Sequence, residues 1–266
     1  MEKYLEITIL ATIQGLTEFL PISSSGHLVI APKLFGFTDP GLAVDAFLHL
    51  GTLAATLIYF RKEVFAMLKS FFSNHPADRK LALGIIIATI PAIAIGFGLK
   101  SFFESDLVRS TTSIAVTLLL GSVLMYFADS FLKKREITKE INNLNFKQMF
   151  FVGLMQTLAL FPGVSRSGST ISAGLFMGLS RDQAARFSFL VGLPAVAGAG
   201  LLALKDLMET GINSDSSIIP LFLGFITSFI VGYLAIDFMI KFLKNNNLWG
   251  FIVYRVILAG ILLIIS

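Results

Sequence analysis

Residues 20–27 read LPISSSGH and residues 161–170 read FPGVSRSGST, and each stretch directly follows a short apolar segment. Those two segments, 4–20 and 146–161, carry polar residues of their own. Proline and glycine end helices, and serine hydroxyls bond to the backbone in turns. The pattern predicts two helices that break inside a membrane, as in proteins with discontinuous spans.

The composition is that of a polytopic membrane protein. Of 266 residues, 55% are hydrophobic and 14% are charged, whereas soluble domains carry about 25% charged residues. This balance excludes a water-soluble globular enzyme. The net charge of +4 indicates basic cytoplasmic loops rather than binding of nucleic acid, and the absence of cysteine excludes disulfides and cysteine metal sites. Eight apolar stretches are evident, most of them long enough to cross a bilayer: 4–20, 43–59, 81–99, 112–131, 146–161, 187–204, 218–240 and 248–265.

The two polar stretches repeat each other at an offset of 142 residues. Of the fourteen positions from Gln14 to His27, six are identical in the second half, and the shared S-x-S-G pattern is the most specific part. We predict a duplicated four-segment unit within a single integral membrane domain, 1–266, with repeat 1 at about 1–132 and repeat 2 at about 145–266. The identical pairs are Gln14 and Gln156, Leu16 and Leu158, Phe19 and Phe161, Ser23 and Ser165, Ser25 and Ser167, and Gly26 and Gly168.

Loop charges predict how the two halves insert. Loops 61–80 and 133–147 each carry five basic and two acidic residues, so both are expected to be cytoplasmic. Loop 205–217 is acidic and expected outside, whereas 241–247 is basic and expected inside. If segment 146–161 crossed the membrane fully, loops 205–217 and 241–247 would lie on the opposite sides from those that their charges predict. We therefore predict an all-α, inverted-topology repeat with six transmembrane helices and two re-entrant helical hairpins.

Charged residues inside apolar stretches are functional candidates, because burying them in lipid is costly. Asp129 with Lys133, and Asp237 with Lys241, have the i,i+4 spacing of structural ion pairs at helix ends. Arg255 lies two turns from the cytoplasmic end and is expected to extend its charged group to the interface. Three residues near the junctions of hairpins and spans could support the site or be merely structural: Asp45, His49 and Arg186.

The first polar stretch brings a carboxylate, hydroxyls and an imidazole together. Gln14 and Glu18 share a helix face at i,i+4 spacing and point into the broken segment. That segment supplies the remaining polar groups: Ser23, Ser24, Ser25 and His27. The alternative is a polar hairpin that only satisfies its own backbone.

The second polar stretch has the elements of a phosphate site. It offers backbone N–H groups flanked by Gly163 and Gly168, and one guanidinium, Arg166, just before a new helix begins. The planar fork of arginine can donate to two phosphate oxygens at once. The alternative is a structural ion pair between Arg166 and Glu18. The hydroxyls of this stretch are those of Ser165, Ser167, Ser169 and Thr170.

Two other phosphate motifs do not fit. A nucleotide-binding P-loop needs lysine where Ser169 follows Gly168. The type-2 phosphatidate phosphatases need a second histidine a few residues after the Ser-Arg pair, and the other histidines here are His49 and His75.

Residues 14–27, QGLTEFLPISSSGH, and 162–170, PGVSRSGST, resemble the two signatures of the bacterial undecaprenyl-diphosphate phosphatase, or bacitracin resistance protein, family. The resemblance covers the whole chain in length and segment order. The family allows Glu or Gln at the position of Gln14, so one anionic ligand is absent here. The resemblance implies hydrolysis of undecaprenyl diphosphate to undecaprenyl phosphate and phosphate, which recycles the lipid carrier for peptidoglycan and other envelope polymers. It also implies the bacterial plasma membrane, with the site opening to the outer face.

The resemblance and the residue chemistry together predict the roles of the site residues. Arg166 and the 163–170 backbone are expected to bind the diphosphate, and Ser24 to attack it with His27 as base or leaving-group acid. A phosphohistidine at His27, or attack by water, stays open. Glu18 and Gln14 are expected to hold a divalent cation, Mg²⁺ or Ca²⁺, or to orient the nucleophile. A polyprenyl diphosphate and membrane lipids are the expected partners, and a homodimer is compatible with the sequence.

A transporter or lipid flippase is the rival class, because inverted repeats with broken helices also build secondary carriers. A carrier needs an anion-binding arginine. It has no need of a hydroxyl, an imidazole and a carboxylate beside that arginine, so the site favours an enzyme.

Overall fold

The computed structural model describes residues 2–38, 41–103, 105–133, 139–210 and 218–265. These residues are helical apart from turns, connections and one isolated bridge between Lys139 and Leu179. The helices are α1 Glu2–Phe19, α2 Ser24–Phe35, α3 Leu42–Tyr59, α4 Arg61–Ser70, α5 Pro76–Gly98, α6 Lys100–Phe103, α7 Asp106–Arg109, α8 Thr111–Lys133, α9 Phe146–Gln156, α10 Arg166–Phe176, α11 Arg181–Thr210, α12 Ile218–Asn245 and α13 Trp249–Ile265, with 3-10 turns at Ile141–Asn143 and Thr157–Leu160.

Four helices of the described chain are long and apolar enough to cross a membrane. They lie in α5, α8, α11 and α12, at Pro76–Gly98, Thr111–Leu132, Arg181–Leu201 and Ile219–Asn245. The two remaining predicted spans form helices whose apolar parts are shorter, Phe47–Tyr59 in α3 and Trp249–Ile264 in α13. The chain is thus a helical protein of membrane type.

Both predicted helix breaks are present. Helix α1 ends at Phe19 and α2 begins at Ser24, while α9 and its 3-10 extension end at Leu160 and α10 begins at Arg166. Each turn ends on a serine with positive φ, 78° at Ser23 and 77° at Ser165, and no other non-glycine residue of the described chain has positive φ. Strained backbone of this kind costs about 1–3 kcal/mol and concentrates at functional sites.

The two serines also cap the helices that follow. The Ser23 hydroxyl accepts a hydrogen bond from the N–H of Gly26 at 3.3 Å, and the Ser165 hydroxyl accepts one from Gly168 at 3.1 Å. A cap of this type satisfies an N–H group that has no partner within its own helix. Helices α2 and α10 therefore start in the same way, 142 residues apart.

Part of the predicted cytoplasmic loop 61–80 is a helix. Helix α4 occupies Arg61–Ser70, and α5 begins at Pro76. Met67 of α4 is buried, whereas Arg61 and Lys69 are exposed. The charges of this segment did not indicate the helix, whereas its apolar residues at helical spacing are consistent with one.

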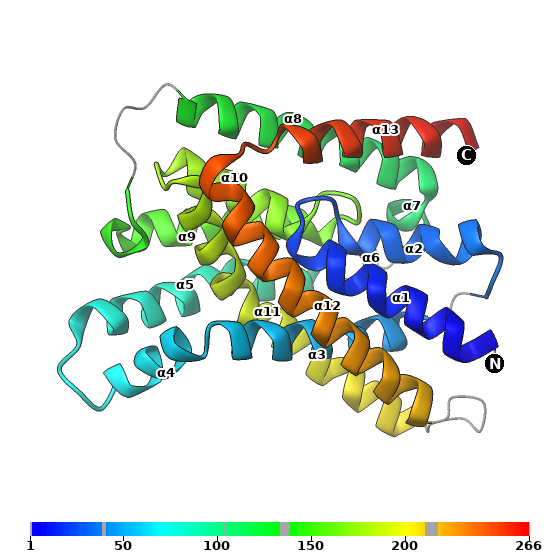
Figure 1. The fold of residues 1–266 in the computed structure, drawn as a ribbon, viewed down its shortest axis with the longest axis horizontal. Helices are drawn as coiled ribbons and strands as arrows, with labels where there is room; N and C mark the ends of the chain where they lie inside the picture. The colour runs from blue at the N-terminus through cyan, green and yellow to red at the C-terminus, as the bar shows by residue number, and fades with distance from the viewer. Residues whose placement is uncertain (1, 39–40, 104, 134–138, 211–217, 266) are drawn as a thin grey trace.

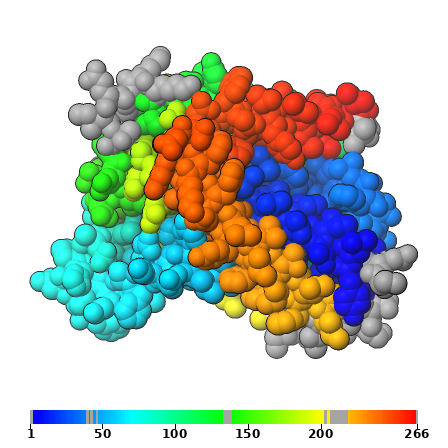
Figure 2. Space-filling view, viewed as in Figure 1, coloured from blue at the N-terminus to red at the C-terminus, as the bar shows by residue number. Residues whose placement is uncertain are grey.

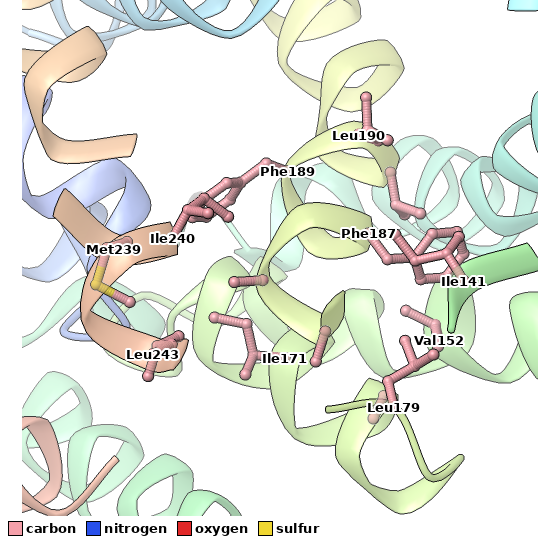
Figure 3. Close-up of a cluster of buried hydrophobic side chains, with 14 of the residues drawn as sticks. Ile141, Val152, Ile171, Leu179, Phe187, Phe189, Leu190, Met239, Ile240 and Leu243 are labelled. Atoms are coloured by element: carbon pink, nitrogen blue, oxygen red, sulfur yellow. The ribbon is translucent and has the colours of Figure 1, made fainter. Parts of the chain in front are cut away.

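Contacts between the two halves of the chain build the core. Helix α12 packs against α1 and α3, and α13 lies along α8 (Figure 1). Figure 2 shows α12 closing this face of the molecule between α1 and the region of α3 to α5. Figure 3 shows Phe187, Phe189 and Leu190 of α11 in a buried cluster with side chains of α9, α10 and α12. This core holds α11 beside the second hairpin.

The ends of the helices divide between two sides of the molecule. The α4–α5 connection and the start of α9 lie at one end in Figure 1, and the end of α11 and the start of α12 lie at the opposite end. The Lys80 ammonium donates to the Asn142 carbonyl at 3.0 Å, which joins two of the predicted cytoplasmic loops. Residues 134–138 and 211–217 of the predicted loops lie outside the described residues.

Candidate active site

The turns of the two hairpins meet. The Gly163 N–H donates to the Ser23 hydroxyl at 3.0 Å, and the Ser167 hydroxyl donates to the Leu20 carbonyl at 3.0 Å. Gly163 has φ 98°, and a Cβ at this position would lie 2.7 Å from the Ile114 carbonyl oxygen. Only glycine fits this close approach. Polar groups 140 or more residues apart in sequence therefore share one region.

The Glu18 carboxylate lies at the centre of that region. It is 6% exposed, and its Oε1 accepts from Arg166 Nη2 at 2.6 Å. The Ser24 hydroxyl donates to Oε2 at 2.8 Å. Glu18 and Ser24 therefore lie together as expected, and the Glu18–Arg166 ion pair, which the sequence left open as the alternative role of Arg166, is formed. Because a carboxylate can accept a proton from the hydroxyl that it binds, the contact makes Ser24 a candidate nucleophile with Glu18 beside it.

Gln14 and His49 complete the surroundings of this carboxylate. Gln14 Nε2 donates to Glu18 Oε2 at 3.1 Å and to the Thr52 hydroxyl at 3.4 Å, whereas Gln14 Oε1 is buried without a partner in the described chain. His49 Nε2 lies 3.4 Å from Glu18 Oε2. Its Nδ1 is 2.7 Å from the carbonyl of Asp45 and must donate there, since a carbonyl only accepts. His49 thus lies beside the site, one of the two roles that the sequence left open.

Two nitrogens of the Arg166 guanidinium are hydrogen-bonded, and the third has no partner among the described residues. Its Nη1 donates to the Ser188 carbonyl at 3.2 Å, and its Nε is buried without a partner among the described residues. The guanidinium lies against Gly192, where a Cβ would be 2.6 Å from the Arg166 Cζ. Buried donors are nearly always bonded in folded proteins, so an open one indicates a ligand or a water. The free Nε is a donor that a phosphate oxygen can use.

His27 faces away from Ser24 and Glu18. Its Nδ1 donates to the Ser23 carbonyl at 2.7 Å, and its Nε2 lies 2.7 Å from the Tyr254 hydroxyl. The two rings are stacked with centroids 5.7 Å apart. The expected convergence of imidazole, hydroxyl and carboxylate is thus formed in this structure by His49, Ser24 and Glu18, and His27 holds the turn through Ser23.

The predicted phosphate-binding groups of the second hairpin are largely occupied within the fold. Ser165 and Ser167 share a hydrogen bond of 3.1 Å, and Thr170 bonds to the Ser188 hydroxyl at 2.6 Å. The N–H groups of Gly163 and Gly168 are bonded to Ser23 and Ser165. In the first hairpin, the hydroxyls of Ser23 and Ser25 lie 3.4 Å apart. Substrate must displace a hydroxyl before it can use either glycine N–H.

Arg255 does not reach the interface, and the expectation that it would was wrong. The residue is 0% exposed, because its guanidinium lies between the two turns. Nη1 donates to Pro21 in the first turn, and Nη2 donates to Gly163 and Val164 in the second. The signal available in the sequence was an arginine within an apolar helix. The full set of its acceptors is the carbonyls of Pro21 (3.2 Å), Leu118 (3.0 Å), Gly163 (2.9 Å) and Val164 (3.1 Å) and the hydroxyl of Ser122 (3.1 Å).

The remaining charged candidates form ion pairs away from the site. Lys241 pairs with Asp237 at 2.6 Å, as predicted, and Arg186 pairs with Glu63. Asp129 pairs with Arg181 of α11 at 2.6 Å, a contact that helical spacing could not indicate. The side chain of Lys133, its predicted partner, lies outside the described residues.

A small cavity of about 10 Å³, room for about one water, lies beside the carboxylate. Its polar wall is formed by Glu18, Arg166, Thr52 and Thr56. Phe19 and Phe189, which meet edge to face at 5.2 Å, lie in its apolar wall. Glu18 and Arg166 therefore border one small enclosed space, which a phosphate group must widen to enter.

Comparison with known proteins agrees with the two signatures. The family model of the bacitracin resistance protein BacA matches residues 7–261. An undecaprenyl-diphosphatase of Synechococcus elongatus is 41% identical over 96% of this chain and 90% of its own length. An undecaprenyl-diphosphatase of Alteromonas mediterranea is 42% identical over 97% of both chains. The family model and these relatives cover nearly the whole chain, including both hairpin turns. The chain therefore belongs to the BacA family of bacitracin resistance proteins.

Proposed function

We propose that this chain is an undecaprenyl-diphosphate phosphatase, a hydrolase that splits undecaprenyl diphosphate into undecaprenyl phosphate and inorganic phosphate. The observation that carries the proposal is the contact of Glu18 with both Ser24 and Arg166 beside one cavity. A hydroxyl, a base and a phosphate-binding cation are the groups that phosphoryl transfer needs. The relatives of the same name, alike over nearly the whole chain, support the same conclusion.

The geometry supports Ser24 as the nucleophile and Glu18 as its base. In the proposed first step, Glu18 takes the Ser24 proton while the hydroxyl oxygen attacks the terminal phosphorus. The bond from that phosphorus to the bridging oxygen breaks, and undecaprenyl phosphate leaves. Water then hydrolyses the phosphoserine to release phosphate. We assign the base role to Glu18 rather than to His27, because both ring nitrogens of His27 are bonded elsewhere.

Arg166 binds the diphosphate in this proposal. Its Nε has no partner in the described chain, and Nη2 bonds to Glu18 before substrate arrives. Once the cavity widens to admit a diphosphate, the buried Nε is a donor available to it. As the phosphate draws Arg166 away from Glu18, the carboxylate loses a neutralising partner and becomes a stronger base for Ser24. Binding and activation of the nucleophile are thereby coupled.

A divalent cation, Mg²⁺ or Ca²⁺, is part of the proposal. No group of three or more His, Asp or Glu side chains in the described residues could hold a metal, so an all-protein cage is not available there. Glu18 and Gln14 would hold the ion together with substrate oxygens. The unpartnered Gln14 Oε1 is an oxygen of the kind that hard cations prefer. Such an ion would neutralise charge on the diphosphate in a site of low dielectric constant.

We further propose a single domain with six crossings, two re-entrant hairpins and inverted halves, in the plasma membrane with the site open to the outer face. The equal offset of 142 residues between the two capped turns supports the duplication. The separation of helix ends in Figure 1 agrees with the loop charges. Exposed apolar side chains such as Ile90 and Leu234 support contact with membrane lipids. Whether the protein forms a homodimer is tested by measuring its mass in detergent.

Release of phosphate by the pure protein in detergent tests the enzyme against the rival transporter. An enzyme releases phosphate from undecaprenyl diphosphate with no second compartment, and Arg166→Ala removes the activity. A carrier releases none. If the pure protein binds the lipid but does not cleave it, under conditions with Mg²⁺ and Ca²⁺ supplied, the proposal is wrong.

A further inference from the structure

A much larger apolar groove adjoins the polar cavity. Its volume of about 330 Å³ is within the roughly 300–1,000 Å³ typical of ligand sites. All thirteen residues that line it are apolar, and they come from α3, α4 and the turn after it, α5 and α11. Two of them, Leu53 of α3 and Leu193 of α11, also line the cavity that contains Glu18 and Arg166. The groove and the cavity therefore adjoin at these two leucines, whose side chains lie between them.

Helix packing explains why the groove exists. Helices α3 and α5 both pack against α11, and the short helix α4 joins them at one end. The space between α3 and α5 thus has α11 as its floor, with Leu190, Leu193 and Pro194 facing it. Residues deep in the groove are buried, such as Ile85 at 7% exposure, whereas Ile86 at 52% lies at its open side. The groove thus has an open side at Ile86 and a closed side at Ile85.

We propose that this groove binds the isoprenoid tail of the substrate, with Leu53 and Leu193 at the point where the tail meets the diphosphate. This inference rests on the proposed function. The cavity beside Glu18 is far smaller than the groove and has a polar wall, so it suits the diphosphate end of the substrate, for which it must widen, rather than the tail. A long isoprenoid must bury apolar surface, and each buried methylene group contributes about 0.8 kcal/mol. The all-apolar groove that adjoins the cavity supplies that surface.

The alternative occupant is bulk membrane lipid, and labelling of single cysteines separates the two. The chain has no cysteine of its own. Ile86→Cys places a thiol at the groove, and Ile257→Cys places one on α13, with 52% and 58% exposure of the native side chains. Each thiol is alkylated with a bulky maleimide after the protein has folded and been purified, so that misfolding cannot mimic an effect of the groove.

Two measurements are compared for the two positions. The first is the ratio of the KM for undecaprenyl diphosphate to the KM for a five-carbon prenyl diphosphate. We expect alkylation of Ile86→Cys to raise this ratio at least tenfold. Alkylation of Ile257→Cys should leave the ratio unchanged. We also expect undecaprenyl phosphate to slow alkylation of Ile86→Cys at least fivefold, while inorganic phosphate does not, as measured by mass spectrometry.

Equal effects at the two positions, or none at Ile86→Cys, would overturn the groove proposal. The proposed function fails separately, when unmodified protein releases no phosphate from undecaprenyl diphosphate. The protection measurement needs no turnover, so it still shows whether the groove binds the tail in that case.

Discussion

Replacing Arg255 with methionine tests whether the two hairpin turns depend on one buried guanidinium. Arg255 is 0% exposed and donates to the carbonyls of Pro21, Gly163 and Val164. Methionine has a similar length but no donor, so the Arg255→Met variant leaves these three turn carbonyls without that partner. The acceptors of Arg255 in α8 are Leu118 and Ser122. They are less affected, because the Ser122 hydroxyl still donates to the Leu118 carbonyl in the variant.

The expected loss follows from the three carbonyls. A buried polar group that loses its partner costs about 1–3 kcal/mol. We take the lower end of about 1 kcal/mol for each of the three carbonyls, because water can enter a loosened turn. The arrangement with both turns in contact is then destabilised by about 3 kcal/mol in total. Since 1.4 kcal/mol corresponds to a factor of about ten, the population of that arrangement relative to open ones falls by about 100-fold. We expect kcat to fall by up to this factor.

Phosphate release in detergent measures kcat, and the fluorescence of the single tryptophan, Trp249, follows thermal unfolding. Arg186→Met is the matched control, because its ion pair with Glu63 is partly exposed and such pairs contribute about 0–1 kcal/mol. Arg255→Lys keeps the charge but has one nitrogen in place of three, so partial recovery is expected. If Arg255→Met retains the kcat and Tm of the unmodified protein, the two turns do not depend on this residue.

Four further predictions concern the site and the membrane. Arg166→Ala should abolish phosphate release and Arg166→Lys should restore less than a tenth of it, because lysine lacks the planar fork; full activity of the lysine variant would remove the phosphate-clamp assignment. Ser24→Ala should lower kcat by at least 1,000-fold, as expected for loss of a nucleophile, while bound substrate remains detectable; a phosphate trapped on His27 would instead reverse the assignment. Chelator should inhibit and Mg²⁺ or Ca²⁺ should rescue, with a weaker metal response in Glu18→Gln; full activity in chelator would limit Glu18 to its contacts with Ser24 and Arg166. A cysteine at Lys139 should react with an impermeant maleimide only from the cytoplasmic side of membranes, and labelling from outside would contradict the inverted arrangement.

Much of the site was predictable because it depends on local chemistry. Glu18 and Gln14 lie four residues apart on one helix, so their shared face follows from helical periodicity. The serines and glycines of the two turns predicted helix breaks, since these residues cap helices and tolerate positive φ. Arg166 was expected just before a new helix, and it is the first residue of α10, 142 positions after the first residue of α2.

The choice of histidine was not predictable. Sequence proximity favoured His27 as the partner of Ser24, but its ring turns toward Tyr254 of α13. His49 approaches Glu18 instead, because α3 packs beside α1. Which face a helix turns toward its neighbours depends on packing, and both histidines lie on helices whose rotation no local pattern specifies.

The sequence by itself determined the helical membrane class, because long apolar runs leave backbone groups that only helices can satisfy in lipid. It also determined where the helices break and which polar residues those breaks carry. The tertiary structure decided which of these groups meet: Arg255 with both turns, Asp129 with Arg181, and a groove between α3 and α5. Such contacts join residues far apart in the chain, so they depend on how the helices pack and on the room left between them rather than on the spacing of residues along any one helix.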